Sequence, residues 1–499
     1  MVIIAITAIF IFWPKGSAFL LPLQFIPSFI TFVAAASGLL GIGFLLILVL
    51  TAVFGRVYCA ALCPLGILQD GIRGLARKFR RKSYYGYQKP LPKLQLAIFV
   101  LILVSSLLGS LSLLNLFEPY SLFGRIATNL LAPILLGLRN LVIPVLEHFG
   151  VYRFSTISLH HISLSVLFLN LSLFVALIIM VVFRGRLYCN TVCPVGYALG
   201  FFAKYSLFKI RIDPENCTLC GKCALDCPSG CIDSANMQID ANRCIMCFDC
   251  LESCPASSIR YGFVHEVPAV QEPDRRKRRF LAQSFLGLAA VTAAGMALRS
   301  KVRGALLPEK SKPVMPPGAG NLDHFTARCT ACHLCVRHCP TTVIRPAVGE
   351  YGLSGMMQAT LDFSLGYCDY DCTICSDICP TGALQPLPLG EKRLTQLGIV
   401  KLVPKRCVVY RFQQDCGACA EVCPTHAVYT RERRGVFYPW TNAELCIGCG
   451  HCELVCPAQP EKAITVSGTC IQTKALPPFS QETPAKQSKE SEALQEFPF

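Results

Sequence analysis

Residues 217–228 read Cys-Thr-Leu-Cys-Gly-Lys-Cys-Ala-Leu-Asp-Cys-Pro, and residues 244–255 read Cys-Ile-Met-Cys-Phe-Asp-Cys-Leu-Glu-Ser-Cys-Pro. Both stretches have the spacing Cys-x2-Cys-x2-Cys-x3-Cys-Pro. In this pattern the first three thiolates bind three irons of one [4Fe–4S] cubane, and the fourth cysteine binds the neighbouring cubane. The tandem therefore predicts two clusters, one held by Cys217, Cys220, Cys223 and Cys254, and the other by Cys244, Cys247, Cys250 and Cys227.

The 30 cysteines of this 499-residue chain admit two other interpretations, a disulfide framework or zinc sites. Disulfide-dense proteins are usually small and secreted, because they lack an adequate core, whereas 53% of this chain is hydrophobic. Zinc sites pair Cys-x2-Cys elements and need neither a third cysteine at the same spacing nor a trailing Cys-Pro. The spacing therefore favours iron–sulfur clusters over both.

Four more cysteine quartets follow, and each of them ends in Cys-Pro. The second has a longer first gap, which matches a radical-SAM triad, but its trailing Cys-Pro and its neighbouring cluster runs argue against that interpretation. The quartets predict four further clusters and six in all. Their ligands are Cys329, Cys332, Cys335 and Cys339; Cys368, Cys372, Cys375 and Cys379; Cys407, Cys416, Cys419 and Cys423; and Cys446, Cys449, Cys452 and Cys456.

A different cysteine motif is repeated near the N-terminus. Residues 55–64 read Gly-Arg-Val-Tyr-Cys-Ala-Ala-Leu-Cys-Pro, and residues 185–194 read Gly-Arg-Leu-Tyr-Cys-Asn-Thr-Val-Cys-Pro. Each Cys-x3-Cys pair places two thiols one helical turn apart on one face. If the two copies face each other, four thiols converge, and they could hold a metal or a further cluster, form redox disulfides, or simply pack as buried residues. These thiols are Cys59, Cys63, Cys189 and Cys193.

Apolar stretches predict an α-helical membrane domain over residues 1–204. The segment 126–148 is interpreted as an amphipathic or re-entrant piece, because Pro133, Arg139 and Pro144 interrupt it. Basic residues gather in 71–93 and are sparse in 118–159, so the positive-inside rule places both ends of this domain in the cytoplasm. These basic flanks explain the net charge of +16 without nucleic-acid binding. The four expected spans are 2–20, 28–54, 94–117 and 160–183.

The remaining sequence divides by composition into soluble domains and connecting segments. Residues 275–281 read Arg-Arg-Lys-Arg-Arg-Phe-Leu before an apolar run, which predicts a fifth span or a twin-arginine-like export signal with Lys277 in place of the first arginine. The predicted segments are a two-cluster domain (205–265), this basic flank and fifth span (275–303), a linker (304–320), a four-cluster domain (321–470) and a disordered tail (471–499).

Four further residues carry weaker expectations. His160 and His161 begin a predicted span, where interface histidines are favoured over haem ligands; they could equally form hydrogen bonds to a quinone. Cys231 and Cys470 fall outside every quartet and are expected to be structural.

These motifs resemble a known family of membrane ferredoxins. Residues 1–265, with two Cys-x3-Cys-Pro motifs before a two-cluster run, resemble the NapH/MauN proteins. Residues 275–470, with a twin-arginine-like segment before four cluster motifs, resemble the NapG/MauM proteins. The resemblance implies a natural fusion of both partners, with α+β bacterial-ferredoxin-like domains joined to a helical membrane domain. It also implies a nested pairing of the distal quartets, in which the first shares ligands with the fourth and the second with the third.

The same resemblance implies a function in the bacterial inner membrane. It predicts a multi-pass protein, with 205–265 in the cytoplasm and 321–470 in the periplasm, that relays electrons between quinol and a periplasmic or membrane redox partner such as a cytochrome or reductase. The sequence contains no nucleotide-binding fingerprint or acid–base site, so it predicts an electron-transfer subunit of a quinol dehydrogenase complex. One alternative is an accessory factor that supplies electrons for assembling a periplasmic redox enzyme. A redox sensor would need an output domain, and the sequence contains no candidate for one.

Overall fold

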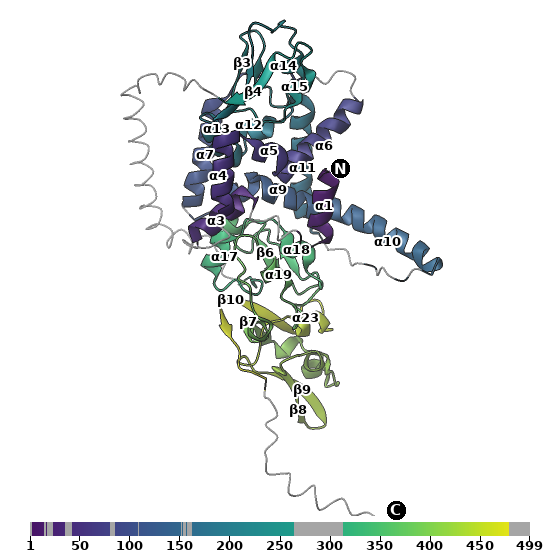
Figure 1. Cartoon of the computed structure of the whole chain (residues 1–499). Coiled ribbons are helices and arrows are strands. Elements are labelled where there is room, and N and C mark those ends of the chain that lie inside the picture. The colour runs from purple at the N-terminus through teal and green to yellow at the C-terminus, as the bar shows by residue number, and fades with distance from the viewer. Residues whose placement is uncertain are drawn as a thin grey trace, which may run out of the picture.

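The computed structural model describes residues 2–13, 16, 23–34, 42–79, 85–107, 109–150, 152, 156, 162–263 and 313–478. Figure 1 shows three parts in a row, with a helical domain between a small cysteine-rich domain (teal) and a larger cysteine-rich domain (green to yellow). His160, His161, the segment 275–303 and most of the predicted linker and tail lie outside the described residues.

The helical domain contains the two copies of the Cys-x3-Cys-Pro motif in equivalent places. In each copy a long apolar helix ends at Gly-Arg, a five-residue helix carries the first cysteine, and the second cysteine precedes a helix that begins at proline. The helices are α1 (Val2–Phe12), α3 (Phe25–Ala34), α4 (Ile42–Phe54), α5 (Val57–Ala61), α6 (Pro64–Phe79), α7 (Pro92–Leu107), α8 (Ser112–Phe117), α9 (Pro119–Ile126), the π-helical η3 (Ala127–Leu131), α10 (Ala132–His148), α11 (Leu164–Arg184), α12 (Leu187–Thr191) and α13 (Pro194–Ala203).

Two helical runs in the described residues are long and apolar enough to cross a membrane. They are Pro119–His148, with 30 residues, and Leu164–Arg184, with 21. The predicted interruption of 126–148 is wrong, because Pro133 lies in the first turn of α10 and Pro144 is accommodated inside that helix. The predicted span 28–54 contains two helices, α3 and α4. The arrangement of four spans plus a fifth stays a prediction.

The small cysteine-rich domain follows α13 directly. Strand β1 (Phe208–Ile212) pairs antiparallel with β4 (Ile259–Phe263), and β2 (Ile232–Asp233) pairs with β3 (Gln238–Ile239). The short helices α14 (Lys222–Asp226) and α15 (Asp249–Ser253) pack against each other between them. Two ion pairs from the basic helix α6, Arg73–Asp249 and Arg77–Asp226, join this domain to the helical domain.

The larger cysteine-rich domain is built from short helices and two-stranded sheets. Strand β7 pairs with β10, β5 with β6, and β8 with β9, all of them antiparallel. The elements are α17 (Leu322–Arg328), α18 (Leu334–His338), β5 (Ile344–Pro346), η4 (Leu353–Gly355), β6 (Ala359–Leu361), α19 (Ile374–Asp377), α20 (Leu389–Lys392), β7 (Thr395–Leu402), η5 (Pro404–Arg406), α21 (Val408–Phe412), α22 (Ala418–Glu421), β8 (Val428–Arg433), β9 (Val436–Thr441), α23 (His451–Val455) and β10 (Ile464–Lys474).

One hydrophobic core runs through the helical domain into both cysteine-rich domains. It includes Ile245 from the small domain, Leu199 and Phe123 from the helices, and Cys332 and Ile378 from the larger domain. The two cysteine-rich domains therefore contact the helical domain at opposite ends (Figure 1) through packed apolar side chains.

Candidate functional site

The cysteines of the small domain form two groups. Cys223 interacts electrostatically with Cys217, Cys220 and Cys254, and Cys250 interacts with the other group. The structure thus brings together the two ligand sets that the motif predicts, because α14 and α15 carry the third cysteine of each run side by side. The second group is Cys227, Cys244, Cys247 and Cys250.

Cys231 lies at the second of these groups, although the sequence predicted only a structural role. Its sulfur is 3.5 Å from the Cys227 sulfur, and its thiol also interacts with Cys244. The hydrogen bond from Cys231 lowers the pKa of the Cys227 thiol to about 7. Hydrogen bonds to cluster sulfurs tune reduction potential, so Cys231 would be placed to influence a cluster bound by this group.

The four quartets of the larger domain pair consecutively, which overturns the nested pairing. Helix α18 packs against α19 and α22 against α23, so each quartet meets its neighbour in sequence. Cys335 interacts with Cys379, and Cys419 interacts with Cys456. The resulting sets are Cys329, Cys332, Cys335 and Cys379; Cys368, Cys372, Cys375 and Cys339; Cys407, Cys416, Cys419 and Cys456; and Cys446, Cys449, Cys452 and Cys423.

Iron analysis of double variants distinguishes the two pairings. In the consecutive pairing, Cys335→Ala with Cys379→Ala removes two ligands of the same cluster, so the full-length chain should lose roughly four irons. Cys335→Ala with Cys456→Ala removes one ligand from each of two clusters, so the chain should lose roughly eight irons. The nested pairing expects the opposite order, so a larger loss from the first pair would refute the consecutive arrangement.

Burial keeps most of these thiols protonated until a metal displaces the proton. It raises the pKa of Cys247 to about 12 and that of Cys449 to about 11. Bare thiols in these positions are therefore neutral at pH 7, and they become thiolates on binding iron. Among the described residues, no three His, Cys, Asp or Glu side chains are arranged to hold a single metal ion. A cubane instead takes one thiolate at each of four separate irons, and every quartet offers four thiols.

The four Cys-x3-Cys-Pro thiols converge inside the helical domain, next to the small domain. Each of these cysteines is only 5% exposed, and all belong to the central core. Cys63 interacts electrostatically with Cys59 and Cys189, and Cys193 interacts with the other three. The two copies of the motif therefore face each other, and this is the condition under which the sequence predicted that their four thiols converge. We call Cys59, Cys63, Cys189 and Cys193 the four-thiol site.

Two buried arginines bracket the four-thiol site in a reciprocal arrangement. Arg56 and Arg186, at most 1% exposed, occupy equivalent places in the two repeats. Arg186 Nη1 donates to the Cys59 carbonyl oxygen (2.7 Å), and Arg56 Nη2 donates to the Cys189 carbonyl oxygen (3.4 Å). Arg56 Nη2 also lies 3.8 Å from the Cys59 sulfur. A charge this deeply buried requires compensation, and these arginines place positive charge beside the thiols.

The partners of the two arginines differ. Arg186 forms an ion pair with Asp70 of α6, whereas Arg56 donates to the Asn190 side chain (3.2 Å) and the Asn242 carbonyl oxygen (2.8 Å). Arg56 forms no ion pair with a carboxylate in the described part of the chain. Gln69 Nε2 donates to the Cys189 sulfur at 3.4 Å. The repeated Gly-Arg at the start of both motifs could have indicated from the sequence that the two arginines belong to this site. Nothing in the sequence indicates the same for Gln69.

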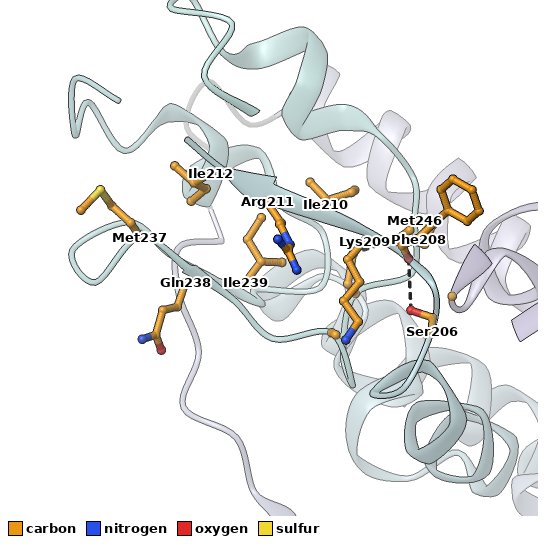
Figure 2. Close-up of a pocket in the computed structure, with 13 residues that line it drawn as sticks. Ser206, Phe208, Lys209, Ile210, Arg211, Ile212, Met237, Gln238, Ile239 and Met246 are labelled. Carbon is orange, nitrogen blue, oxygen red and sulfur yellow. Dashed lines mark hydrogen bonds between the residues drawn. The ribbon is translucent and has the colours of Figure 1, made fainter. Parts of the chain in front are cut away.

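A cavity of about 410 Å³ opens beside the cluster ligand Cys244. Figure 2 shows Lys209 and Arg211 on β1 projecting toward the strand that carries Gln238 and Ile239. Burial, together with the like charges of Arg211 and Lys204, lowers the pKa of Lys209. Lys209 and Arg211 therefore make the surface next to Cys244 positively charged.

The first half of the larger domain is held on the helical domain by polar contacts. Asn115 Nδ2 donates to the Cys329 carbonyl oxygen (3.2 Å), and Asn129 Nδ2 lies 3.0 Å from His333 Nδ1. His338 Nε2 lies 3.1 Å from the Phe10 carbonyl oxygen. The set around Cys332 thus lies against helices α1, α8 and η3.

Comparison with known families agrees with these cysteine groups. A model described as a 4Fe-4S dicluster domain matches residues 209–255, and two others with the same description match 328–384 and 413–459. The match over 328–384 encloses the first two distal quartets, and the match over 413–459 contains the fourth quartet and the third without Cys407. A model described as a 4Fe-4S binding domain matches residues 36–82 and 166–213, which contain the two halves of the four-thiol site.

Curated relatives point to the same class of protein. The methylamine utilization ferredoxin-type protein MauM of Methylorubrum extorquens is 34% identical over 197 residues, which cover 37% of this chain and 86% of that protein. The ferredoxin-type protein NapG of Escherichia coli is 29% identical over 199 residues (37% and 83%), and its NapF is 26% identical over 147 residues (30% and 82%). The chain is a ferredoxin-type iron–sulfur electron-transfer protein with several 4Fe–4S domains. It belongs to the MauM/NapG family of ferredoxin-type proteins.

Proposed function

We propose that this chain fuses a NapH/MauN-type membrane ferredoxin to a NapG/MauM-type ferredoxin, and relays electrons between the quinone pool and a periplasmic or membrane redox partner. The observation that carries the proposal is the placement of the two cysteine-rich domains at opposite ends of the helical domain (Figure 1), with the four-thiol site between them. Six [4Fe–4S] clusters occupy the quartets. This order of redox groups fits a route that crosses the membrane.

The surface of the helices supports a membrane location. Leu101 on α7 is 59% exposed, Phe168 on α11 is 75% exposed, and Leu141 on α10 is 73% exposed. Large apolar patches on a water-soluble surface are rare, whereas a lipid-facing helix requires them. The basic helix α6 contacts the small domain. By the positive-inside rule this contact supports a cytoplasmic small domain and, at the opposite end, a periplasmic larger domain.

The four-thiol site holds a seventh cluster in this proposal. Four thiolates around a [4Fe–4S] core carry net negative charge, and burying such a group in the helical domain requires nearby positive charge. Arg56 and Arg186 supply it, and the interaction of Arg56 with Cys59, Cys189 and Cys193 shows that the guanidinium lies among the thiols. Arg56 also interacts with Cys244 of the small domain, so the seventh cluster would lie next to the small domain's second cluster.

Glycines permit close packing within each of the two repeats around this cluster. A Cβ on Gly66 would lie 2.4 Å from the Cys59 carbonyl oxygen, and a Cβ on Gly196 would lie 2.1 Å from that of Cys189. Both distances are shorter than a van der Waals contact, so any larger residue would displace the short helices that carry the thiols. The Cys-Pro-x-Gly end of each motif is therefore part of the site's geometry.

Stopped-flow spectroscopy under anaerobic conditions tests the proposed function. The full-length chain in detergent, reduced by dithionite, is mixed with a menaquinone analogue while cluster absorbance is followed. Rapid reoxidation, with about 24 irons per chain for six clusters or about 28 for seven, is the expected result. A fully loaded chain that does not exchange electrons with the quinone would contradict the relay and favour the accessory factor for enzyme assembly.

A further inference from the structure

We propose that a cavity between α1, the segment before α3, α5 and α9 binds the ring of a membrane quinone. The inference rests on the proposed function and assigns a position to its quinone site. The cavity has a volume of about 210 Å³, and its lining includes Phe10, Gln24, Ala61, Pro64, Tyr120 and Phe123. We call it the α1–α9 cavity.

The lining of this cavity suits a flat apolar ring that carries polar oxygens. Phe10 and Phe123 meet edge to face with ring centroids 5.6 Å apart, and both are buried. Only two lining side chains are polar, Gln24 and Tyr120. Ligand sites of this kind combine mostly apolar walls with a few placed polar groups.

Both polar side chains can donate to a quinone oxygen. Tyr120 is 5% exposed, and among the described residues no side chain or backbone group forms a hydrogen bond with its hydroxyl. Gln24 accepts from the Tyr58 hydroxyl through Oε1 (3.1 Å), but its Nε2 contact to the Leu62 carbonyl oxygen is long, at 3.4 Å. The Tyr120 hydroxyl lines the cavity and is therefore free to donate to a quinone carbonyl.

The cavity lies between two groups of cysteines. Pro64, which lines it, follows Cys63 of the four-thiol site directly. On the other side, Tyr120 lies one helical turn before Gly124 on α9, and Gly124 packs closely against the Cys332 carbonyl oxygen of the larger domain. A quinol bound here would lose two electrons, one at a time, to oxidised clusters held by these cysteines, would release two protons to water and would leave as a quinone.

The lipid side of the cavity is accessible. Ala61 is exposed, and Ile6 and Ile9 are only partly buried. A quinone tail needs an apolar exit of this kind, because it stays in the hydrocarbon while the ring enters the protein.

Titration with the quinone analogue 2-heptyl-4-hydroxyquinoline N-oxide tests the proposal, with quenching of its fluorescence by the full-length chain in lipid nanodiscs as the readout. Tyr120→Phe and Gln24→Leu should each weaken binding about tenfold, the factor that corresponds to one lost hydrogen bond. Ala61→Trp should abolish binding by filling the mouth. Tyr197→Phe and Leu101→Trp are matched controls outside the cavity, and both should bind as the unchanged chain does.

The outcomes separate the position of the site from the function. If the unchanged chain binds the analogue and is reoxidised by menaquinone, but all three cavity variants bind equally well, the cavity is not the site and the relay stands. If the unchanged chain neither binds the analogue nor is reoxidised, the relay and the cavity assignment both fail. Iron content equal to that of the unchanged chain shows that a variant has lost binding and not its clusters.

Discussion

Replacing Cys59 and Cys189 together with alanine is expected to remove about four irons per chain and to interrupt electron transfer between the two cysteine-rich domains. Together the two substitutions take one ligand from each half of the four-thiol site, so a cluster there loses half of its protein ligands. Iron and sulfide analysis gives the stoichiometry, and the electron paramagnetic resonance spectrum of the reduced chain shows whether one cluster signal is missing.

The same double substitution should also destabilise the helical domain. Arg56 would keep its buried charge without the anion beside it, and leaving a buried charge unpaired costs about 3–5 kcal/mol. Should the alanine variant fail to fold, Cys59→Ser with Cys189→Ser keeps polar side chains in place and leaves iron content as the readout. Cys470→Ala is the control, because this cysteine is exposed and outside every group. Unchanged iron in the folded double variant would exclude a cluster at this site.

Gly124→Val is expected to separate the larger cysteine-rich domain from the helices. A Cβ on Gly124 would lie 2.2 Å from the Cys332 carbonyl oxygen and 3.1 Å from the Phe10 ring. The clash is with the backbone of a cluster ligand, which a bound cluster would hold in place, so the backbone cannot easily move away. Overpacking of this kind typically lowers the free energy of unfolding by about 1–3 kcal/mol. The clusters of the larger domain should then fill normally but accept electrons from quinol much more slowly.

Gly137→Val provides the matched control for this prediction. Gly137 lies in the same helical run, and a Cβ there would meet nothing within 4 Å. Stopped-flow traces should show a slow phase for the distal clusters only in Gly124→Val, and limited proteolysis should release the larger domain from that variant first. Equal kinetics in both variants would mean that electrons do not pass through this interface.

The cysteine spacing predicted the small domain in detail, because its loops are too short to allow many arrangements. The two runs are separated by 16 residues between Cys227 and Cys244, and the pairing of β1 with β4 closes the domain around them. The nested pairing of the distal quartets failed for a related reason. All four runs end alike, so spacing within a run does not say which neighbour supplies its fourth ligand, and that choice depends on the packing of α18 on α19 and α22 on α23.

Local chemistry is what the sequence by itself determined here: cysteine runs that match [4Fe–4S] ligand sets, two equivalent Cys-x3-Cys-Pro turns, and apolar helices with basic ends. These features depend on residues close together in the chain, whose geometry is set by short loops and helical periodicity. Tertiary structure alone decided which quartets share ligands, that Arg56 and Arg186 reach across to the opposite repeat, and that Cys231 lies beside Cys227. Those relations join segments that lie far apart in the chain, or on opposite sides of a turn, and only the packing of the whole core brings them together.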